Sequence, residues 1–347
     1  VVDMREELRL GNRGMFSRLL LERLDACLQA GQQAMLFINR RGYAPSVMCR
    51  KCGEVLSCSQ CDVKMTFHQA DRGLHCHYCG LVLPMPDKCP SCGSSYLRPV
   101  GAGTQKVEEE LRKRYPGKEI VRMDLDTTSG KDAHRVLLDR FRSGAARIMV
   151  GTQMIAKGLD FPQVTLVGAV LADVSLNLPD YRSEERTFQL LTQVAGRAGR
   201  AEMPGEVVIQ TYRPEHFAIQ AAARQDYRGF FSQEFARRRQ RLYPPFTMMV
   251  RLLCESPREE QAESVSAVLY GRVAEALAAR PDWKRRVLFY RRDESPIKRM
   301  MGLARSQVLL KLLEHPDSAQ VLAFLKQLGE APWPCRVHLE INPASLA

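Results

Sequence analysis

Eight of the eleven cysteines in this sequence lie in four pairs of the form C-x-x-C. The two-residue spacer lets both thiolates of a pair bind one tetrahedral metal ion, and eight thiolates suit two Cys₄ zinc sites. Full thiolate coordination leaves no open position for water, so we expect structural rather than redox or hydrolytic sites. A disulfide framework is the weaker interpretation, because we expect a cytosolic chain without a signal peptide.

The spacing of the pairs predicts which cysteines share an ion. Five, fourteen and nine residues separate successive pairs, and only fourteen approaches the usual ribbon spacing of about 15 to 20. We therefore expect two nested sites. Their ligand sets are Cys49, Cys52, Cys89 and Cys92 for the first, and Cys58, Cys61, Cys76 and Cys79 for the second. His75 and His77 flank Cys76 and are expected to be exposed bystanders rather than ligands.

Segment 193–200, QVAGRAGR, has the composition of a phosphate sensor. An arginine is always charged and binds phosphate oxygens bidentately. The sequence contains no loop of the form G-x-x-x-x-G-K-[ST], which in ATP-driven motors holds the phosphates. A second domain would therefore have to bring the nucleotide. The alternative is that this segment is only a basic surface turn.

The elements around these motifs follow an α/β pattern. Apolar runs at 34–38, 119–123, 147–150, 164–171 and 206–210 alternate with helical patterns near 15–30, 104–115, 131–142 and 184–195. Continuous apolar strands joined by helices predict a buried parallel sheet, with its chemistry at the carboxyl ends of the strands. We assign 1–42 and 101–222 to this domain. Segment 43–100 has few aliphatic runs, and we interpret it as an inserted module in which metal replaces a core.

The remainder of the chain is basic and then α+β. A net charge of +12 and arginine clusters within 224–241 and 284–305 favour a nucleic-acid partner over a membrane. Residues 223–245 form a predicted basic connector. Residues 246–347 then follow the order βαββαβ, which predicts a ferredoxin-like domain.

Three motifs in this order resemble the second motor domain of superfamily 2 helicases: NRRG at 39–42, GTQMIAKGLDFP at 151–162, and QVAGRAGR at 193–200. With the cysteine insertion, the chain resembles the PriA family of replication-restart helicases over nearly its whole length. The resemblance implies an α/β, RecA-like parallel-sheet lobe 2, an inserted two-zinc Cys₄ module, and a small ferredoxin-like α+β domain. The run at 173–186 fits both a family signature and a helix N-terminus with favourable carboxylates.

The resemblance also implies residue roles. Arg200 would be the arginine finger, Arg197 its neighbour on the γ-phosphate, and Gln193 the residue that orients the γ-phosphate or water. Gly196 and Gly199 would let the backbone approach the nucleotide. The remaining expected sites are Asp160 and Gly158 for nucleotide, and Thr152, Gln153, Lys157, Arg40 and Arg41 for DNA.

The function implied is that of the C-terminal half of an ATP-dependent 3′–5′ DNA helicase. Such a helicase would remodel stalled or branched forks and initiate primosome assembly. Its cofactors would be two Zn²⁺, with ATP and Mg²⁺ bound mainly by a first motor lobe, so this chain alone is expected to be inactive. Its partners would be forked and single-stranded DNA, single-stranded-DNA-binding protein, primosome loading proteins and the replicative helicase, in the bacterial cytoplasm at the nucleoid. The alternative is a non-catalytic, zinc-braced module that binds DNA or proteins.

Overall fold

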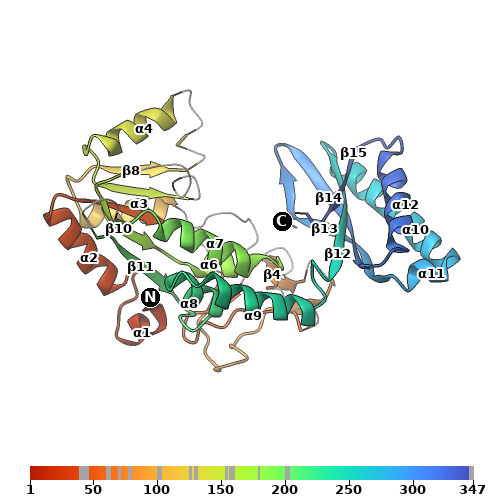
Figure 1. Ribbon diagram of the computed structural model, residues 1–347, viewed down its shortest axis with the longest axis horizontal. Helices are drawn as coiled ribbons and strands as arrows, with labels where there is room; N and C mark the ends of the chain where they lie inside the picture. The colour runs from red at the N-terminus through yellow and green to blue at the C-terminus, as the bar shows by residue number, and fades with distance from the viewer. Residues whose placement is uncertain are drawn as a thin grey trace.

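The structure is a computed structural model. It describes residues 1–38, 47–59, 64–68, 72–76, 80–99, 104–124, 127–128, 132–152, 155, 161–178, 180–199 and 204–343. Figure 1 shows a larger α/β domain, a smaller C-terminal domain, and a cysteine-rich segment near the helix that joins them. Among the described residues, no helix is both long enough and apolar enough to cross a bilayer.

A six-stranded sheet in the order β1-β11-β10-β2-β9-β8 forms the centre of the α/β domain. Every neighbouring pair is parallel. The central strands are buried along their whole length, as expected when helices cover both faces of a parallel sheet. The strands are β1 (Val2–Asp3), β2 (Gln33–Phe37), β8 (Ile120–Met123), β9 (Ile148–Gly151), β10 (Val164–Ala169) and β11 (Glu206–Thr211).

Helices pack on both faces of this sheet. One core cluster joins the sheet to α2 (Arg18–Gln29) and α3 (Thr104–Arg114). A second cluster joins the other face to α4 (Ala133–Arg142) and α7 (Ser183–Ala195). The predicted α/β parallel-sheet fold is therefore confirmed.

Short helices surround the edge of the sheet near β11. They are α1 (Met4–Arg9), α6 (Asp173–Leu176) and α8 (Phe217–Ala223), and the longer α9 (Tyr227–Gln240) leads from them toward the C-terminal domain (Figure 1). Stacked aromatic rings fix α9 against α7. The rings of Phe188 and Phe230 lie 4.3 Å apart at an interplanar angle of 9°.

The C-terminal domain has the predicted βαββαβ order. Its four strands form an antiparallel sheet in the order β13-β14-β12-β15, which is the arrangement of a ferredoxin-like unit. Helices α10 and α12 pack on one face of that sheet. The elements are β12 (Thr247–Ser256), α10 (Glu259–Ala279), α11 (Pro281–Lys284), β13 (Val287–Met300), β14 (Leu303–Leu313), α12 (Ser318–Glu330) and β15 (Arg336–Ile341).

The described residues between 47 and 99 form the cysteine module. It consists of a two-stranded sheet, β3 (Val47–Cys49) with β7 (Leu97–Pro99), and a three-stranded sheet. The strands of the second sheet are β4 (Thr66–His68), β5 (Gly73–His75) and β6 (Val82–Pro84). Such short strands cannot bury a core of their own, and the apolar side chains of the module pack against both larger domains instead.

Candidate functional site

Two of the four C-x-x-C turns, 49–53 and 89–93, are described throughout, and of a third the two ends, Cys76 and Gly80, are described. The first cysteine of each accepts a hydrogen bond from the N–H of the glycine four residues later, at 2.8 to 2.9 Å, for Gly53, Gly80 and Gly93. Each of these glycines has a positive φ, between 68° and 79°. A left-handed residue at that position closes the turn, and glycine adopts it without a side-chain clash. The sequence C-x-x-C-G thus specifies a preformed metal-binding turn.

The first predicted ligand set converges in space. The thiol sulfur atoms of Cys49, Cys52, Cys89 and Cys92 all lie within 4.8 Å of one another. Cys49 Sγ is 3.7 Å from Cys92 Sγ, and Cys52 Sγ is 3.6 Å from Cys89 Sγ. A tetrahedral zinc with bonds of about 2.3 Å requires sulfur separations of about 3.8 Å, whereas a disulfide requires about 2.05 Å. The four thiols therefore fit a zinc ion and not a pair of disulfides.

The pKa of Cys52 shows what metal binding has to overcome. Burial, together with the neighbouring thiols, raises the pKa of Cys52 to about 12 in the metal-free protein. A bound divalent cation offsets this penalty, because it binds the thiolate and not the thiol. Zinc binding by this chain therefore follows from the chemistry of the site and from the family match given below.

The second predicted set is only partly described. Cys58 and Cys76 are both buried and belong to one apolar cluster, while Cys61 and Cys79 lie outside the described residues. His75, expected to be an exposed bystander, lies on β5 with its ring stacked on His68 at a centroid distance of 4.1 Å.

The predicted phosphate sensor lies at the C-terminal end of α7. Gln193 is exposed in the last turn of the helix, Gly196 caps it, and Arg197 follows. Gly199 has a φ of +67°, and a Cβ on Gly205 would lie 2.1 Å from its nitrogen. The backbone of Gly199 therefore packs closely against Gly205, a contact that the sequence analysis did not predict, and the expected approach of Gly199 to a nucleotide stays a prediction. Arg200 lies outside the described residues.

Gly196, also predicted to let the backbone approach the nucleotide, makes no comparably close contact with the described part of the chain. Its φ is −69°, and a Cβ there would meet only two carbonyl oxygens of its own helix, those of Gln193 and Thr192, at 3.6 Å. That distance is ordinary van der Waals contact. Within the described residues, therefore, no close contact requires glycine at position 196.

The position of the phosphate sensor relative to the sheet corrects one prediction. We expected the functional segments at the carboxyl ends of the strands. Instead, the N–H of Gly199 donates to the carbonyl of Val164 at 3.1 Å, and Val164 is the first residue of β10. The reason is topological: α7 follows β10 and leads into β11, so it runs back along the sheet and ends at the amino edge.

Thr152 lies at the opposite edge. It directly follows β9, and its N–H donates to the carbonyl of Met123 at the end of β8, at 3.4 Å. A Cβ on Gly151 would come within 2.7 Å of Ile155, so the chain can pass this point only with glycine. The other predicted contacts lie outside the described residues, namely Arg40, Arg41, Gln153, Lys157, Gly158 and Asp160.

The run at 173–186 is largely structural. Asp173 is fully buried, and it accepts from Thr211 Oγ1 at 2.8 Å and from the N–H of Tyr212 at 2.9 Å. Burial raises the pKa of Asp173 despite these hydrogen bonds. Glu184 and Glu185 occupy the first turn of α7, as expected for a helix N-terminus.

The partners of these two glutamates were not predicted. Arg237 Nη1 lies 2.8 Å from a carboxylate oxygen of Glu184, and Arg238 Nη2 lies 2.7 Å from one of Glu185. Both arginines belong to the basic cluster that we assigned to a polyanion. They instead fasten the connector helix α9 to the first turn of α7. No local pattern in the sequence signals a pairing across about fifty residues.

Two family descriptions match this chain. Residues 58–84 match the PriA DNA helicase Cys-rich region (CRR) domain, and residues 101–202 match the helicase conserved C-terminal domain. The first range lies in the cysteine module. The second contains the elements from α3 through α7, including strands β8, β9 and β10 of the sheet. The fold and site therefore define a helicase C-terminal domain that carries a zinc ribbon.

Relatives of known name extend this match. The replication restart protein PriA of Bacillus subtilis is 49% identical over 330 residues, which cover 95% of this chain and 40% of that protein. PriA of Synechocystis is 42% identical over 358 residues, 100% of this chain and 41% of that protein. Among solved structures, the C-terminal domain of the DEAD-box protein Dbp5 covers 60% of this chain and 79% of its own, at 14% identity and a TM-score of 0.30.

The sequence relatives settle the family. The chain belongs to the family of PriA replication restart proteins and matches the portion that contains the helicase C-terminal domain. It spans about 40% of the length of these two curated relatives.

Proposed function

We propose that this chain is the second motor lobe, with its zinc module and C-terminal domain, of an ATP-dependent 3′–5′ DNA helicase. The whole protein would remodel stalled or branched replication forks and initiate primosome assembly. Homology to PriA, with a helicase C-terminal domain whose predicted phosphate sensor sits at one end of α7, is the observation that carries this proposal.

The segment that we propose to contact the γ-phosphate is described from Gln193 to Gly199, where it lies at the amino edge of the sheet. Arg200 acts as the arginine finger, with Arg197 beside it on the γ-phosphate and Gln193 orienting the phosphate or water. A guanidinium that reaches a transferring phosphoryl group accelerates the reaction by about 10³ to 10⁵. Asp160 and Gly158 contact the nucleotide. ATP and Mg²⁺ are held mainly by a first motor lobe, since none of the 347 residues form a phosphate-binding loop of the required sequence.

The proposed DNA contacts belong to the carboxyl edge. Thr152, Gln153 and Lys157 follow β9, and Arg40 with Arg41 follow β2, so in a parallel sheet both segments start at that edge. Hydroxyl, amide and cationic groups of this kind bind the phosphates and sugars of a strand. Nucleotide and DNA would thus contact opposite edges of one sheet.

The proposed domains are the helicase lobe (1–42 and 101–222), the zinc module (43–100), the connector (223–245) and the C-terminal domain (246–347). The module binds two zinc ions, the second through Cys58, Cys61, Cys76 and Cys79. Partners of the whole protein are forked and single-stranded DNA, single-stranded-DNA-binding protein, primosome loading proteins and the replicative helicase. Its place is the bacterial cytoplasm, at the nucleoid.

The test uses the full-length protein that contains this chain. Arg200→Ala should lower DNA-stimulated ATP hydrolysis by about 10³-fold or more, because it removes the finger, and should leave fork affinity nearly unchanged. Arg135→Ala is the matched control, since Arg135 is an exposed arginine on α4 of the same lobe. Retained turnover in the Arg200 variant contradicts the finger assignment.

The chain by itself tests whether a separate first lobe is needed for ATP hydrolysis, and the Arg200 variant of the full-length protein distinguishes a motor lobe from a non-catalytic binding module. Loaded with zinc and given forked DNA, it should bind DNA and hydrolyse no ATP. Hydrolysis by the chain alone would mean that it holds its own nucleotide site, and the proposal of a separate first lobe would be wrong.

A further inference from the structure

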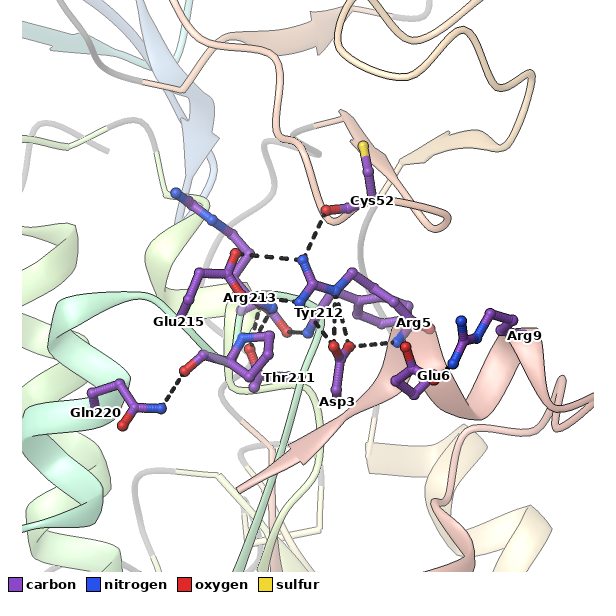
Figure 2. Close-up of polar contacts among 12 residues, drawn as sticks. Asp3, Arg5, Glu6, Arg9, Cys52, Thr211, Tyr212, Arg213, Glu215 and Gln220 are labelled. Carbon is purple, nitrogen blue, oxygen red and sulfur yellow. Dashed lines mark hydrogen bonds and ion pairs between the residues drawn. The ribbon is translucent and has the colours of Figure 1, made fainter.

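Two arginines from different domains bind the backbone of two different metal-binding turns. Arg5, on α1 of the helicase lobe, donates from Nη1 to the carbonyl of Cys52 at 3.2 Å (Figure 2). Arg291, on β13 of the C-terminal domain, donates from Nη1 to the carbonyl of Cys76, also at 3.2 Å. The helicase lobe and the C-terminal domain therefore each bind one metal-binding turn of the zinc module.

The contact with the helicase lobe is made by a paired guanidinium. Asp3 and Glu215 lie 2.8 and 3.0 Å from Nη2 of Arg5, and Nη1 donates both to Glu215, at 3.4 Å, and to the carbonyl of Cys52 (Figure 2). The next residue, Gly53, approaches the lobe so closely that a Cβ would lie 2.0 Å from the carbonyl oxygen of Tyr212. This turn therefore fits against the end of β11 with no space for a side chain.

The contact with the C-terminal domain has the same form. Asp293 pairs with Arg291 at 2.6 Å, and the side chain of Arg291 is only 15% exposed. A Cβ on Gly80, which closes the Cys76 turn, would lie 2.8 Å from Nη1 of Arg291. Because Gly80 has no side chain, the guanidinium of Arg291 can approach the turn.

Apolar packing also joins the module to both domains. Met48 and Val55 of the module cluster with Met4 and Tyr212 of the helicase lobe. Other module side chains form one cluster with residues of the connector and the C-terminal sheet and with Tyr181 of the helicase lobe. Its members include Met65, Leu74, Tyr181, Tyr243, Met249 and Leu309. The module therefore covers the face of the C-terminal sheet opposite to α10 and α12.

We propose that the zinc module is the joint that fixes the C-terminal domain to the helicase lobe, with Arg5 and Arg291 as its positioning residues. The strands of the module are too short to fold without metal, so zinc stabilises the metal-binding turns. These turns in turn contact the helicase lobe and the C-terminal domain. Four thiolates around one Zn²⁺ carry a net charge of −2, and the two guanidinium groups bind the carbonyl oxygens of Cys52 and Cys76, so each orients the backbone of a ligand-bearing turn. This inference rests on zinc binding and not on ATP hydrolysis.

The test on the helicase side measures zinc release from the chain to a coloured chelator. Arg5→Gln should speed release of one of the two proposed ions about tenfold or more, since partners of this kind change metal affinity about 10- to 100-fold. Arg9→Gln is the control: Arg9 lies on the same helix and pairs with the exposed Glu6. Equal release from the two variants overturns the role of Arg5.

The test of Arg291, on the C-terminal domain, measures amide hydrogen exchange. Arg291→Gln should raise exchange in β5 and β14, which share the apolar cluster, and leave β2 and β9 of the helicase sheet unchanged. Arg292→Gln, an exposed neighbour on the same strand, should change neither. Unchanged exchange in the Arg291 variant overturns the role of Arg291.

Removal of zinc from the unmodified chain tests the joint without any substitution. Chelation should raise exchange in β14 and expose the 223–245 connector to protease, while β2 and β9 stay protected. If β14 stays equally protected without metal, the joint is refuted. None of these readouts depends on ATP turnover, so failure of the proposed helicase activity would leave them interpretable.

Discussion

Replacing Arg237 by Met would remove a cation that pairs with a buried carboxylate. Glu184, in the first turn of α7, is 2% exposed, and its carboxylate accepts from Ser183 Oγ at 2.8 Å and pairs with Arg237 at the same distance. Burial is the largest single influence on the pKa of Glu184 and opposes its charge, but Arg237, together with Lys64 and Ser183, holds that pKa below its ordinary value. The ion pair thus stabilises the folded state at pH values above the pKa that Glu184 has in the unfolded chain.

We expect Arg237→Met to lower the free energy of unfolding by about 3 to 5 kcal/mol at neutral pH, the usual effect of breaking a buried pair on one side. Glu234, which Arg237 also approaches at 3.6 Å, keeps its contact with Arg238 at 2.7 Å. The loss should shrink as the pH falls. The wild type loses its ion-pair stabilisation as Glu184 protonates, whereas in the variant burial raises the pKa of Glu184 and protonation relieves the unpaired charge.

The assay is urea unfolding at several pH values from about 7.5 to below 4.5, the ordinary pKa of a glutamate, because the lowered pKa of Glu184 lies below that value. Arg239→Met, an exposed position on the same helix, is the control and should change stability by no more than about 0.5 kcal/mol. A double variant, Glu184→Gln with Arg237→Met, should recover part of the loss, because residue 184 then carries no charge, while Lys64 and Glu234 remain buried. Equal effects of the Arg237 and Arg239 variants, or a loss independent of pH, would refute this reasoning.

Two further predictions concern single residues near the zinc module and α8. Gly53→Ala should destabilise the chain by more than Gly93→Ala. Both glycines have positive φ, but a Cβ at Gly53 meets the carbonyl of Tyr212, whereas nothing lies within 4 Å of a Cβ at Gly93. Thermal unfolding compares the two variants, and equal changes in melting temperature would contradict the contact at Gly53. Burial, helped by nearby Arg213, lowers the pKa of His216 to about 3 from an ordinary 6.5, so the stability that His216 contributes should decline as pH falls from about 6.5 toward 3. His216→Asn keeps a helix cap and should flatten that decline in pH-dependent urea titrations; an unchanged slope would exclude this histidine as the cause.

The sheet was predictable because its signal is local. Each buried strand is a continuous apolar run, and α3, α4 and α7 begin and end within two residues of the predicted ranges. The edge strand β1 was missed, since two residues carry no periodicity. The convergence of Cys49, Cys52, Cys89 and Cys92 followed from loop lengths alone, as spacing limits which turns can share an ion.

The predictions that failed concern which edge of the sheet a helix reaches and which residues far apart in the sequence pair with one another. The sequence places segment 193–200 after a helix, but only the topology shows that this helix ends at the amino edge of the sheet. The roles of Arg237 and Arg238 were likewise invisible, because composition counts charges without showing their partners. The contacts of Arg5 and Arg291 with cysteine carbonyls involve backbone atoms, which no residue pattern encodes.

Helix α7 has one further geometric consequence. Its thirteen residues form an uninterrupted rod about 20 Å long, clasped at its first turn by Arg237 and Arg238 and carrying Gln193 in its last. On that length, a tilt of only about 10° at the first turn moves the far end by about 3 Å, roughly the length of one hydrogen bond. The ion pairs at the first turn therefore act together with the packing of Leu190 and Val194 on the sheet to fix where Gln193 lies.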